Sequence, residues 1–407
     1  MLAWMKSLPM ALSLALWGGC AWKECLTCCD CCPRAAPQIA CRPVDPQAVT
    51  PDLSQVPEHL PPVRPGEQFC ALTEINVQCL AARNSTVANL LVQEAEAVTT
   101  QRKCFNDGSE LASELLLLQA TQQRNEDAAI ALQLFLRLAE AEGGAQNVER
   151  RLHEVEAMQS DVEQLQNRGL APPVSKNELA GERLELLHRQ ADVQGTIHRL
   201  NYQLAESMGV ELAPGTRYWP EVDLVVDPQI PYSDEAVSVA LRNRADLAAL
   251  RLASQADGRE AIAAARIILQ PFGAGSSTSS SSGCLAKLLQ ACALRREADV
   301  RSEQLNSARR DHERTVENEV RQAIDATSTR LLQLSLTRDR QHVADARLKA
   351  SQRQQEVGAA PLTVRKTRLD GLAVEQDLLH DVIEWKIAIV KLKEAQGLLA
   401  SECGYCL

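Results

Sequence analysis

The chain has 407 residues, a formal net charge of −10, 45% hydrophobic residues and only 3% aromatic residues. With so few aromatic side chains, we expect thin helical seams built from Ala, Leu and Val, which argues against a thick globular core. Basic and acidic residues are mixed along the chain without a Lys/Arg block, and this disfavours nucleic acid as a partner.

The N-terminus has the features of an export signal. Lys6 precedes a mostly apolar run, Leu8 to Trp17, which is too short to span a bilayer as a helix. The following Gly18-Gly19-Cys20 resembles a bacterial lipoprotein cleavage box, although Trp17 stands where an aliphatic residue is usual. We therefore predict a signal peptide at 1–19 and lipidation of Cys20, which would anchor the protein to a membrane. An ordinary or uncleaved secretory signal is the alternative.

Residues 20–70 form a segment rich in Pro and Cys, which we interpret as a semi-extended tether. Seven of the 14 cysteines lie between Cys20 and Cys41. The two Cys-x-x-Cys pairs, Cys25/Cys28 and Cys403/Cys406, have the spacing of a zinc site, but export favours disulfides. We predict no metal and no cofactor.

The first helical repeat is predicted at 71–209. A helix is expected from about Leu72 to Thr100, and a longer one from Ser109 to about Gln166, opened by a capping box of Asp107 and Glu110. Gly143-Gly144 should weaken or kink the long helix. A turn at 168–173 leads to a return helix that begins near Asn177 and ends at Gly209. Its apolar seam is Val193, Ile197, Leu200 and Leu204.

An extended linker at 210–233, marked by several prolines, connects to a second helical repeat at 234–397. We expect a helix from Ser233 to Leu269, a flexible Ser-rich loop to Gly283, and a very long helix from Leu285 to about Gln355. A turn at 357–361 then reverses the chain into a return helix. The expected seams are Val316, Val320, Ile324, Thr327, Leu331 and Leu334 on the outgoing arm and Leu378, Val382, Trp385, Ile389 and Leu392 on the return arm. Residues 398–407 are predicted to be a tail.

The two repeats correspond in their turns and endings. Both turns combine Gly with Pro, and both return arms end on a Gly five residues after the last seam Leu, at Gly209 and Gly397. These coincidences indicate a duplication. The predicted fold class is all-α, with two tandem repeats of long antiparallel coiled-coil hairpins.

The segment Ala240-Leu241-Arg242-Asn243-Arg244-Ala245-Asp246-Leu247 resembles the "A-L-x-x-R-P-D-L" sequence that opens the second repeat in the outer membrane efflux protein family, the TolC-like exporters, with Ala245 in place of Pro. The resemblance implies a homotrimeric helical conduit in the periplasm that exports small molecules. With it goes a location at the outer membrane, where the lipid on Cys20 would anchor the protein facing the periplasm. It also implies that the hairpin tips, at Gly169 and Leu170 and at Gly358 and Ala359, face a periplasmic adaptor and an inner-membrane pump. Plain helix-reversing turns without a partner are the alternative.

The chain departs from that family where membrane strands are expected. Two strands of roughly 9 to 11 residues each should lie between the first and the long helix of each repeat. The segments available here, Thr99 to Gly108 and Pro271 to Gly283, are too short or too rich in Ser and Gly. The sequence therefore predicts a TolC-like helical domain whose β-barrel strands are missing or vestigial.

No catalytic constellation is present, so we predict that the protein is not an enzyme. His153-Glu154 is half of a zincin motif, but Ala157 occupies the position of the second His. The remaining helical histidines are interpreted as solvated surface residues: His188, His198, His312, His342 and His380. Besides an export component, a lipid-anchored structural or interaction coiled-coil protein without transport activity stays open.

Overall fold

The architecture comes from a computed structural model that describes residues 41–42, 68–101, 109–213, 215–269, 284–357 and 360–405. All of them belong to one compact unit, Pro33–Leu407. The elements are, in chain order, β1 (Cys41–Arg42), β2 (Gln68–Thr73), α1 (Glu74–Asn84), α2 (Thr86–Gln101), α3 (Ser109–Asn167), α4 (Lys176–Ser207), β3 (Thr216–Glu221), α5 (Ser233–Asn243), α6 (Ala245–Gln255), α7 (Gly258–Leu269), α8 (Cys284–Glu356), α9 (Pro361–Ala395) and α10 (Leu398–Glu402).

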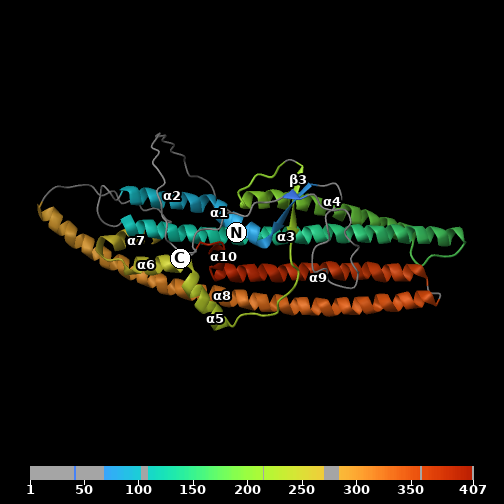
Figure 1. Cartoon of the computed structure of the whole chain (residues 1–407). Coiled ribbons are helices and arrows are strands. Elements are labelled where there is room, and N and C mark those ends of the chain that lie inside the picture. Colours follow the sequence, from blue (N-terminus) through green and yellow to red (C-terminus); the bar gives the residue numbers. More distant parts are fainter. Residues whose placement is uncertain are drawn as a thin grey trace. The chain divides into compact units, whose positions relative to one another are not determined.

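Four long helices form a single layer. Helix α3 packs against both α4 and α9, and α8 packs against α9, so that the order across the layer is α4, α3, α9, α8 (Figure 1). Each repeat contributes one antiparallel hairpin, α3 with α4 and α8 with α9. The predicted all-α fold of two tandem hairpins is confirmed. Among the long helices that the structure describes, α4 packs on α3 and α8 packs on α9, so that α4 and α8 are the outer members of the layer.

The predicted seams form the contacts between these helices. On the return arms Ile197, Leu200 and Leu204 are buried in α4, and Leu378, Val382, Trp385 and Leu392 are buried in α9. On α8 the buried residues are Val316, Val320, Ile324, Thr327 and Leu334. Only Val193, Leu331 and Ile389 of the predicted set are partly exposed. A spacing of three and four residues keeps one stripe of a helix toward its neighbour, and that is the pattern observed.

A small sheet, not expected from the sequence, lies beside the helices. Strand β2 pairs in parallel with β3, from Gln68 with Thr216 to Thr73 with Glu221, and β1 pairs antiparallel with β2. The ring of Phe69 packs edge-on against Trp219 at 5.7 Å. Within the segment 20–70, which we expected to be a semi-extended tether, β1 and the start of β2 therefore belong to this sheet.

The first helix begins later than predicted. Leu72 was expected to open it but lies in β2, fully buried, and the helix starts at Glu74. The hydroxyl of Thr73 caps it by accepting a hydrogen bond from the amide of Asn76 at 3.4 Å. The prediction was wrong because the strand owes its conformation to pairing with β3, which is far away in the sequence.

Two predicted helices are each divided. The helix expected from Leu72 to Thr100 breaks at Ser85, whose buried hydroxyl accepts a hydrogen bond from the amide of Ala88 and so caps α2. The helix expected from Ser233 to Leu269 is divided into α5, α6 and α7 by extended residues at Arg244 and Ala256. None of these three breaks carries a proline, so the sequence pattern did not reveal them.

Helix α3 continues through Gly143-Gly144, contrary to the expected weakening. Both glycines are buried, and a Cβ on Gly144 would lie 3.5 Å from the Gln376 side chain of α9. The absence of side chains at this point allows α9 to pack closely against α3.

Several predictions concern residues outside the described ranges. These are the signal peptide, Cys20, the capping residue Asp107, the turn residues Gly358 and Ala359, and the parts 102–108 and 270–283 of the segments in which we expect no membrane strands.

Candidate partner-docking and assembly surfaces

The tip of the first hairpin is a compact glycine-terminated turn. Gly169 has a φ of 75°, and the amide of Leu170 donates to the carbonyl of Leu165 at 2.9 Å. Together with the bond from Gly169 to Gln166 at 2.9 Å, this is the Schellman pattern that ends a helix. The side chain of Leu170 is 54% exposed. The turn thus presents an apolar side chain to solvent at the end of the layer.

Helix α4 begins after this turn with a strong cap that the sequence analysis missed. The hydroxyl of Ser175 accepts from the amide of Glu178 at 3.2 Å, and the Glu178 carboxylate accepts from the amide of Ser175 at 2.9 Å. The pattern Ser-x-x-Glu is the readable signal for such a capping box. The cap fixes where the return helix starts.

The tip of the second hairpin is described only at its flanks. Val357 is 86% exposed, and α9 starts with Pro361 at its first position, where a proline needs no hydrogen-bond partner. Gly358 and Ala359 themselves lie outside the described residues. A partner contact at either tip stays a prediction.

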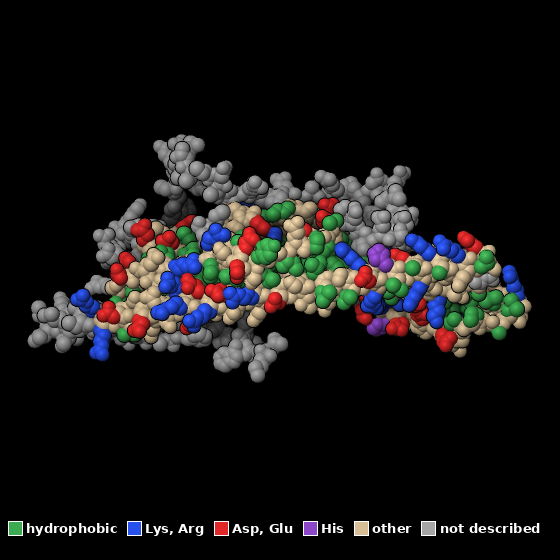
Figure 2. All heavy atoms as spheres, turned by 90° about the horizontal axis from the view of Figure 1, so that it is seen from below, with side chains coloured by type: hydrophobic (Ala, Val, Ile, Leu, Met, Phe, Trp, Pro, Cys, Tyr) green, Lys and Arg blue, Asp and Glu red, His purple; other side chains and the backbone are tan. Residues whose placement is uncertain are grey.

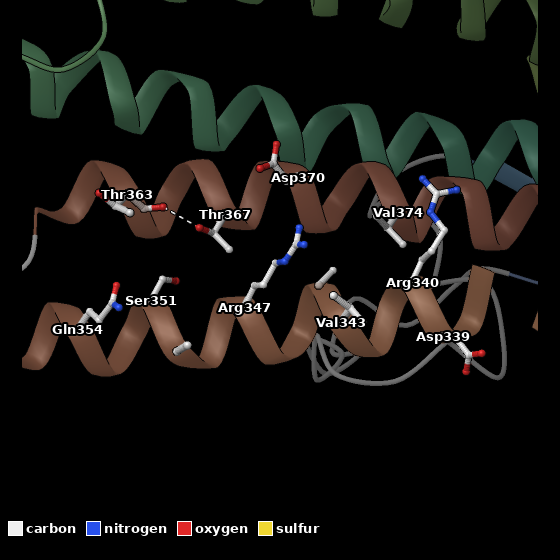
Figure 3. A pocket seen from close by; sticks show the side chains of 12 residues that line it. Asp339, Arg340, Val343, Arg347, Ser351, Gln354, Thr363, Thr367, Asp370 and Val374 are labelled. Carbon is white, nitrogen blue, oxygen red and sulfur yellow. Dashed lines mark hydrogen bonds between the residues drawn. The ribbon is translucent and has the colours of Figure 1, made fainter. Parts of the chain in front are cut away.

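A groove of about 710 Å³ runs between α8 and α9 close to the second tip (Figure 3). Its apolar lining includes Val343 and Val374, and Arg347 reaches from α8 toward α9 beside them. Two acidic and two basic side chains lie among the lining residues, namely Asp339, Asp370, Arg340 and Arg347. The groove is therefore apolar within and balanced in charge, which suits another protein surface better than a strongly charged ligand.

Ion pairs and one buried amide join the two hairpins between the groove and the first tip. The Glu154 carboxylate of α3 accepts from Arg368 at 2.8 Å and from Arg365 at 3.3 Å, both on α9, and Arg365 also donates to Asp161 at 2.7 Å. These carboxylates raise the pKa of Arg365. The buried Asn147 donates to the carbonyl of Leu372 at 2.8 Å. The two repeats are thus held together by specific polar contacts in addition to apolar packing.

The segment that resembles the family motif forms a charged cluster where α9 ends, against the middle of α8. Arg244, only 7% exposed, donates to Asp246, to Glu319 at 2.8 Å and to the carbonyl of Ala395 at 3.4 Å. Ala245 is the first residue of α6, a position that proline also favours, which explains how Ala replaces the Pro of the motif.

His312 of α8 belongs to the same cluster. Its Nε2 lies 2.8 Å from the Asp246 carboxylate, so it is not the solvated surface residue that we expected. Burial alone would raise the pKa of Asp246, but the hydrogen bonds from His312 and Arg244 outweigh that effect and hold this pKa well below its usual value. The cluster ties α5 and α6 to α8 and to the end of α9, and its residues act as structural anchors.

A second groove, of about 580 Å³, lies beside this cluster between α3, α8 and α9. Glu394 lines it, and burial together with the nearby Glu126 raises the pKa of that carboxyl. No group of three or more His, Cys, Asp or Glu side chains suited to a metal ion occurs within the described ranges. His153, half of the zincin-like motif, is exposed.

One of the cysteines in the candidate zinc pairs has a different partner. Cys403 forms a disulfide with Cys79 of α1, 324 residues earlier in the chain. Cys70 is disulfide-bonded as well. A zinc site that uses Cys403 is therefore excluded, and the expectation that cysteines pair as disulfides is confirmed for these residues.

Solved structures with a similar fold include several outer-membrane channels. The fold is similar to that of the Campylobacter jejuni CmeC outer membrane channel, with 10% identity over 80% of this chain and 85% of that chain and a TM-score of 0.59. It is similar to the outer-membrane channel OprN, with 15% identity, 80% and 90% coverage and a TM-score of 0.59. The Vibrio cholerae outer membrane protein VceC matches with 12% identity, 80% and 96% coverage and a TM-score of 0.57.

These likenesses confirm the predicted TolC-like resemblance at the level of the fold. No family model matches the sequence, and no curated protein matches it either. Within the described ranges, none of the helices is both long enough and apolar enough to cross a membrane.

Proposed function

We propose that this chain is the subunit of a homotrimeric periplasmic helical conduit, which serves as the outer-membrane component of a small-molecule export system. The observation that carries the proposal is the single layer of four helices. A single layer cannot enclose a lumen, whereas copies joined side by side through α4 and α8 can form a closed ring. The shared fold with outer-membrane channels supports the same arrangement.

Exposed apolar side chains on both outer helices support lateral assembly. On α4, Leu184 is 65% and Tyr202 is 68% exposed. On α8, Leu332, Leu336 and Val343 are between 52% and 62% exposed. Figure 2 shows the face on the α8 side, where hydrophobic side chains gather between charged ones. A second copy of the chain would remove these side chains from water.

Charge also favours a head-to-tail contact between copies. The first hairpin, α3 with α4, carries sixteen acidic and eight basic side chains. The second hairpin, α8 with α9, carries twenty basic and seventeen acidic side chains. Opposite net charges attract when α4 of one copy meets α8 of the next, and they disfavour contacts between two identical edges.

The assembly is tested by the particle mass of purified variants. We expect Leu184→Glu and Leu336→Glu to shift the trimer toward monomer, because each places a charge in the contact between copies. Val225→Glu is the matched control, since Val225 is 58% exposed but lies in the linker before α5. Loss of the trimer in the control alone, or a trimer unaffected by both outer-helix variants, would contradict the proposed contact.

The export function is tested in cells. A strain that lacks the protein should accumulate a fluorescent toxic compound, and the wild-type chain should restore its efflux. We further propose that the tips at Gly169 and Leu170 and at Gly358 and Ala359 meet a periplasmic adaptor and, through it, an inner-membrane pump. Leu170→Asp should then abolish efflux while the trimer persists. Unchanged accumulation in the deletion strain would favour a structural coiled-coil protein without transport.

Membrane attachment is proposed to occur through lipid on Cys20 in the outer membrane. Mass spectrometry of the mature N-terminal peptide should find Cys20 as the modified first residue. Cys20→Ala should release the protein from the membrane fraction. An unmodified Cys20 in membrane-bound protein would overturn this part of the proposal.

A further inference from the structure

The C-terminal segment, Leu398 to Tyr405, was predicted to be a tail but is built into the body. It contains the five-residue helix α10, which contacts α1, α3 and α9. Leu399 and Ala400 are buried, and Leu399 shares the main hydrophobic cluster with Cys403. The segment follows directly on α9, the return helix of the second hairpin.

Polar groups from the first repeat hold this segment by its backbone. Asn125 of α3, 2% exposed, accepts from the amides of Leu399 at 3.0 Å and Ala400 at 3.4 Å, and donates to the carbonyl of Glu394 at 3.0 Å. Gln78 of α1 donates to the carbonyl of Leu399 at 2.8 Å. Gly397 gives α10 no side-chain cap, so Asn125 supplies that cap from another helix.

A covalent bond adds to these contacts. The Cys79–Cys403 disulfide connects α1, the first helix of the first repeat, to the residue that follows α10. A helix of five residues has little stability of its own, so its position depends on what fastens it. The bond raises the effective concentration of the segment at its site. It also keeps the C-terminal end of α9 close to α1.

We propose that the Cys79–Cys403 pair is a redox-sensitive clasp that fastens the C-terminal segment when oxidised and releases it when reduced. In the reducing direction, a thiolate of a dithiol attacks one sulfur of the Cys79–Cys403 bond, forms a mixed disulfide with that cysteine and releases the other cysteine as a thiolate. The second thiolate of the dithiol then attacks the dithiol's own sulfur in the mixed disulfide, which releases the remaining cysteine thiolate and leaves the dithiol oxidised. Both cysteine thiolates take up a proton from water. A protein disulfide that accepts two electrons closes the clasp by the reverse exchange.

Burial limits the access of a reducing dithiol to the Cys79–Cys403 bond. Cys403 is 8% exposed and Cys79 is partly buried, so a dithiol reaches the bond mainly when the segment loosens locally. Reduction then acts near the C-terminal end of α9. The ion pairs of Glu154 and Asp161 lie in the other half of α9, near the hairpin tips. The inference does not depend on the proposed export function.

Hydrogen exchange measured by mass spectrometry tests the clasp on the full mature protein. The oxidised wild type, the dithiothreitol-reduced wild type and the double variant Cys79→Ser/Cys403→Ser are compared. We expect the amides of Leu399 and Ala400 to exchange roughly tenfold faster or more in the last two samples, with little change in the peptides of α3 around Glu154. Because Cys70 is also in a disulfide, dithiothreitol is added to the double variant as a control, and no further change in the C-terminal segment is expected.

Two results would overturn the clasp. Equal exchange of Leu399 and Ala400 in oxidised and reduced protein would show that the noncovalent contacts suffice. Equal acceleration throughout α3, α9 and the C-terminal segment would show a global staple in place of a local clasp.

Discussion

Gly397 lies directly against the backbone carbonyl of Asn243, and a Cβ on this glycine would be only 2.8 Å from that oxygen. The first repeat contains an equivalent contact, where a Cβ on Gly209 would be 2.8 Å from the Cβ of Asn84. Both glycines have a positive φ, 62° at Gly209 and 71° at Gly397. In each repeat the end of the return helix thus packs on the Asn that ends the opening helix, which supports the duplication inferred from the sequence.

Gly397→Ala is therefore expected to destabilise the protein by about 2 kcal/mol or more. A positive φ costs an L-residue about 1–2 kcal/mol, and the contact with Asn243 adds to that cost. The measurement is the free energy of unfolding in urea. Gly371→Ala is the matched control, because Gly371 lies within α9 with open space around it and should gain about 0.5–1 kcal/mol. Equal changes in the free energy of unfolding for Gly397→Ala and Gly371→Ala would refute the close contact between Gly397 and Asn243.

Asn125→Ala should lower the unfolding free energy by about 2–3 kcal/mol. The substitution leaves the buried amides of Leu399 and Ala400 and the carbonyl of Glu394 without their partner. Gln123→Ala on the same helix removes only a partly buried bond to Asp127, and a loss below about 0.5 kcal/mol is expected. If thermal unfolding shows the same midpoint for both variants, Asn125 does not cap α10.

Asp246→Asn should remove part of the acid sensitivity of folding. The folded-state pKa of Asp246 is depressed, so its contribution to stability is present above about pH 4, the unfolded value, and is lost as pH falls toward the folded pKa. The variant should be less stable than wild type at pH 7, and the difference should shrink below about pH 4. Urea titrations at several pH values measure it. A constant difference across the range would argue against the pairing with Arg244 and His312.

Glu394→Gln should have the opposite effect on stability and make the protein more stable at pH 7. Burial and the neighbouring Glu126 raise the folded-state pKa of Glu394, so the ionised carboxylate costs stability as pH rises above its unfolded value of about 4.3. The variant is expected to melt at a higher temperature than wild type at pH 7, with no gain at pH 4. A lower melting temperature at pH 7 would mean that Glu394 is stabilised by a partner in its ionised form.

Glu154→Ala tests the polar bond between the hairpins. Its carboxylate, nearly buried, contacts both Arg365 and Arg368, and its loss should cost about 2 kcal/mol. The exposed pair of Lys176 and Glu163 provides the control, since Glu163→Ala should cost less than about 1 kcal/mol. If Glu154→Ala and Glu163→Ala lower the free energy of unfolding by similar amounts, the ion pairs of Glu154 between α3 and α9 contribute no more to stability than an exposed pair does.

The parts of the fold that depend on local periodicity could be predicted from the sequence. The seams of α4, α8 and α9 follow from apolar spacing, and the glycine endings at Gly209 and Gly397 follow from backbone sterics. The parallel pairing of β2 with β3 could not be predicted, because its partners lie more than a hundred residues apart and neither strand has a strong pattern of its own.

The same distinction holds for the candidate sites. The turn at Gly169 could be predicted from its residues, and the resemblance around Arg244 pointed to the motif. The roles of His312, Asn125 and Cys79 could not, since each depends on a residue brought close only by the tertiary fold. A solvated histidine and one bonded to Asp246 have the same appearance in the sequence.

We have proposed that copies of this chain join through α4 and α8 into a closed ring. The mass of the purified mature protein in solution, at low and at high salt, tests this most directly. We predict a particle of three chains whose stability falls as salt screens the oppositely charged hairpins. A particle of one or two chains under all conditions would contradict it, because neither can enclose a conduit.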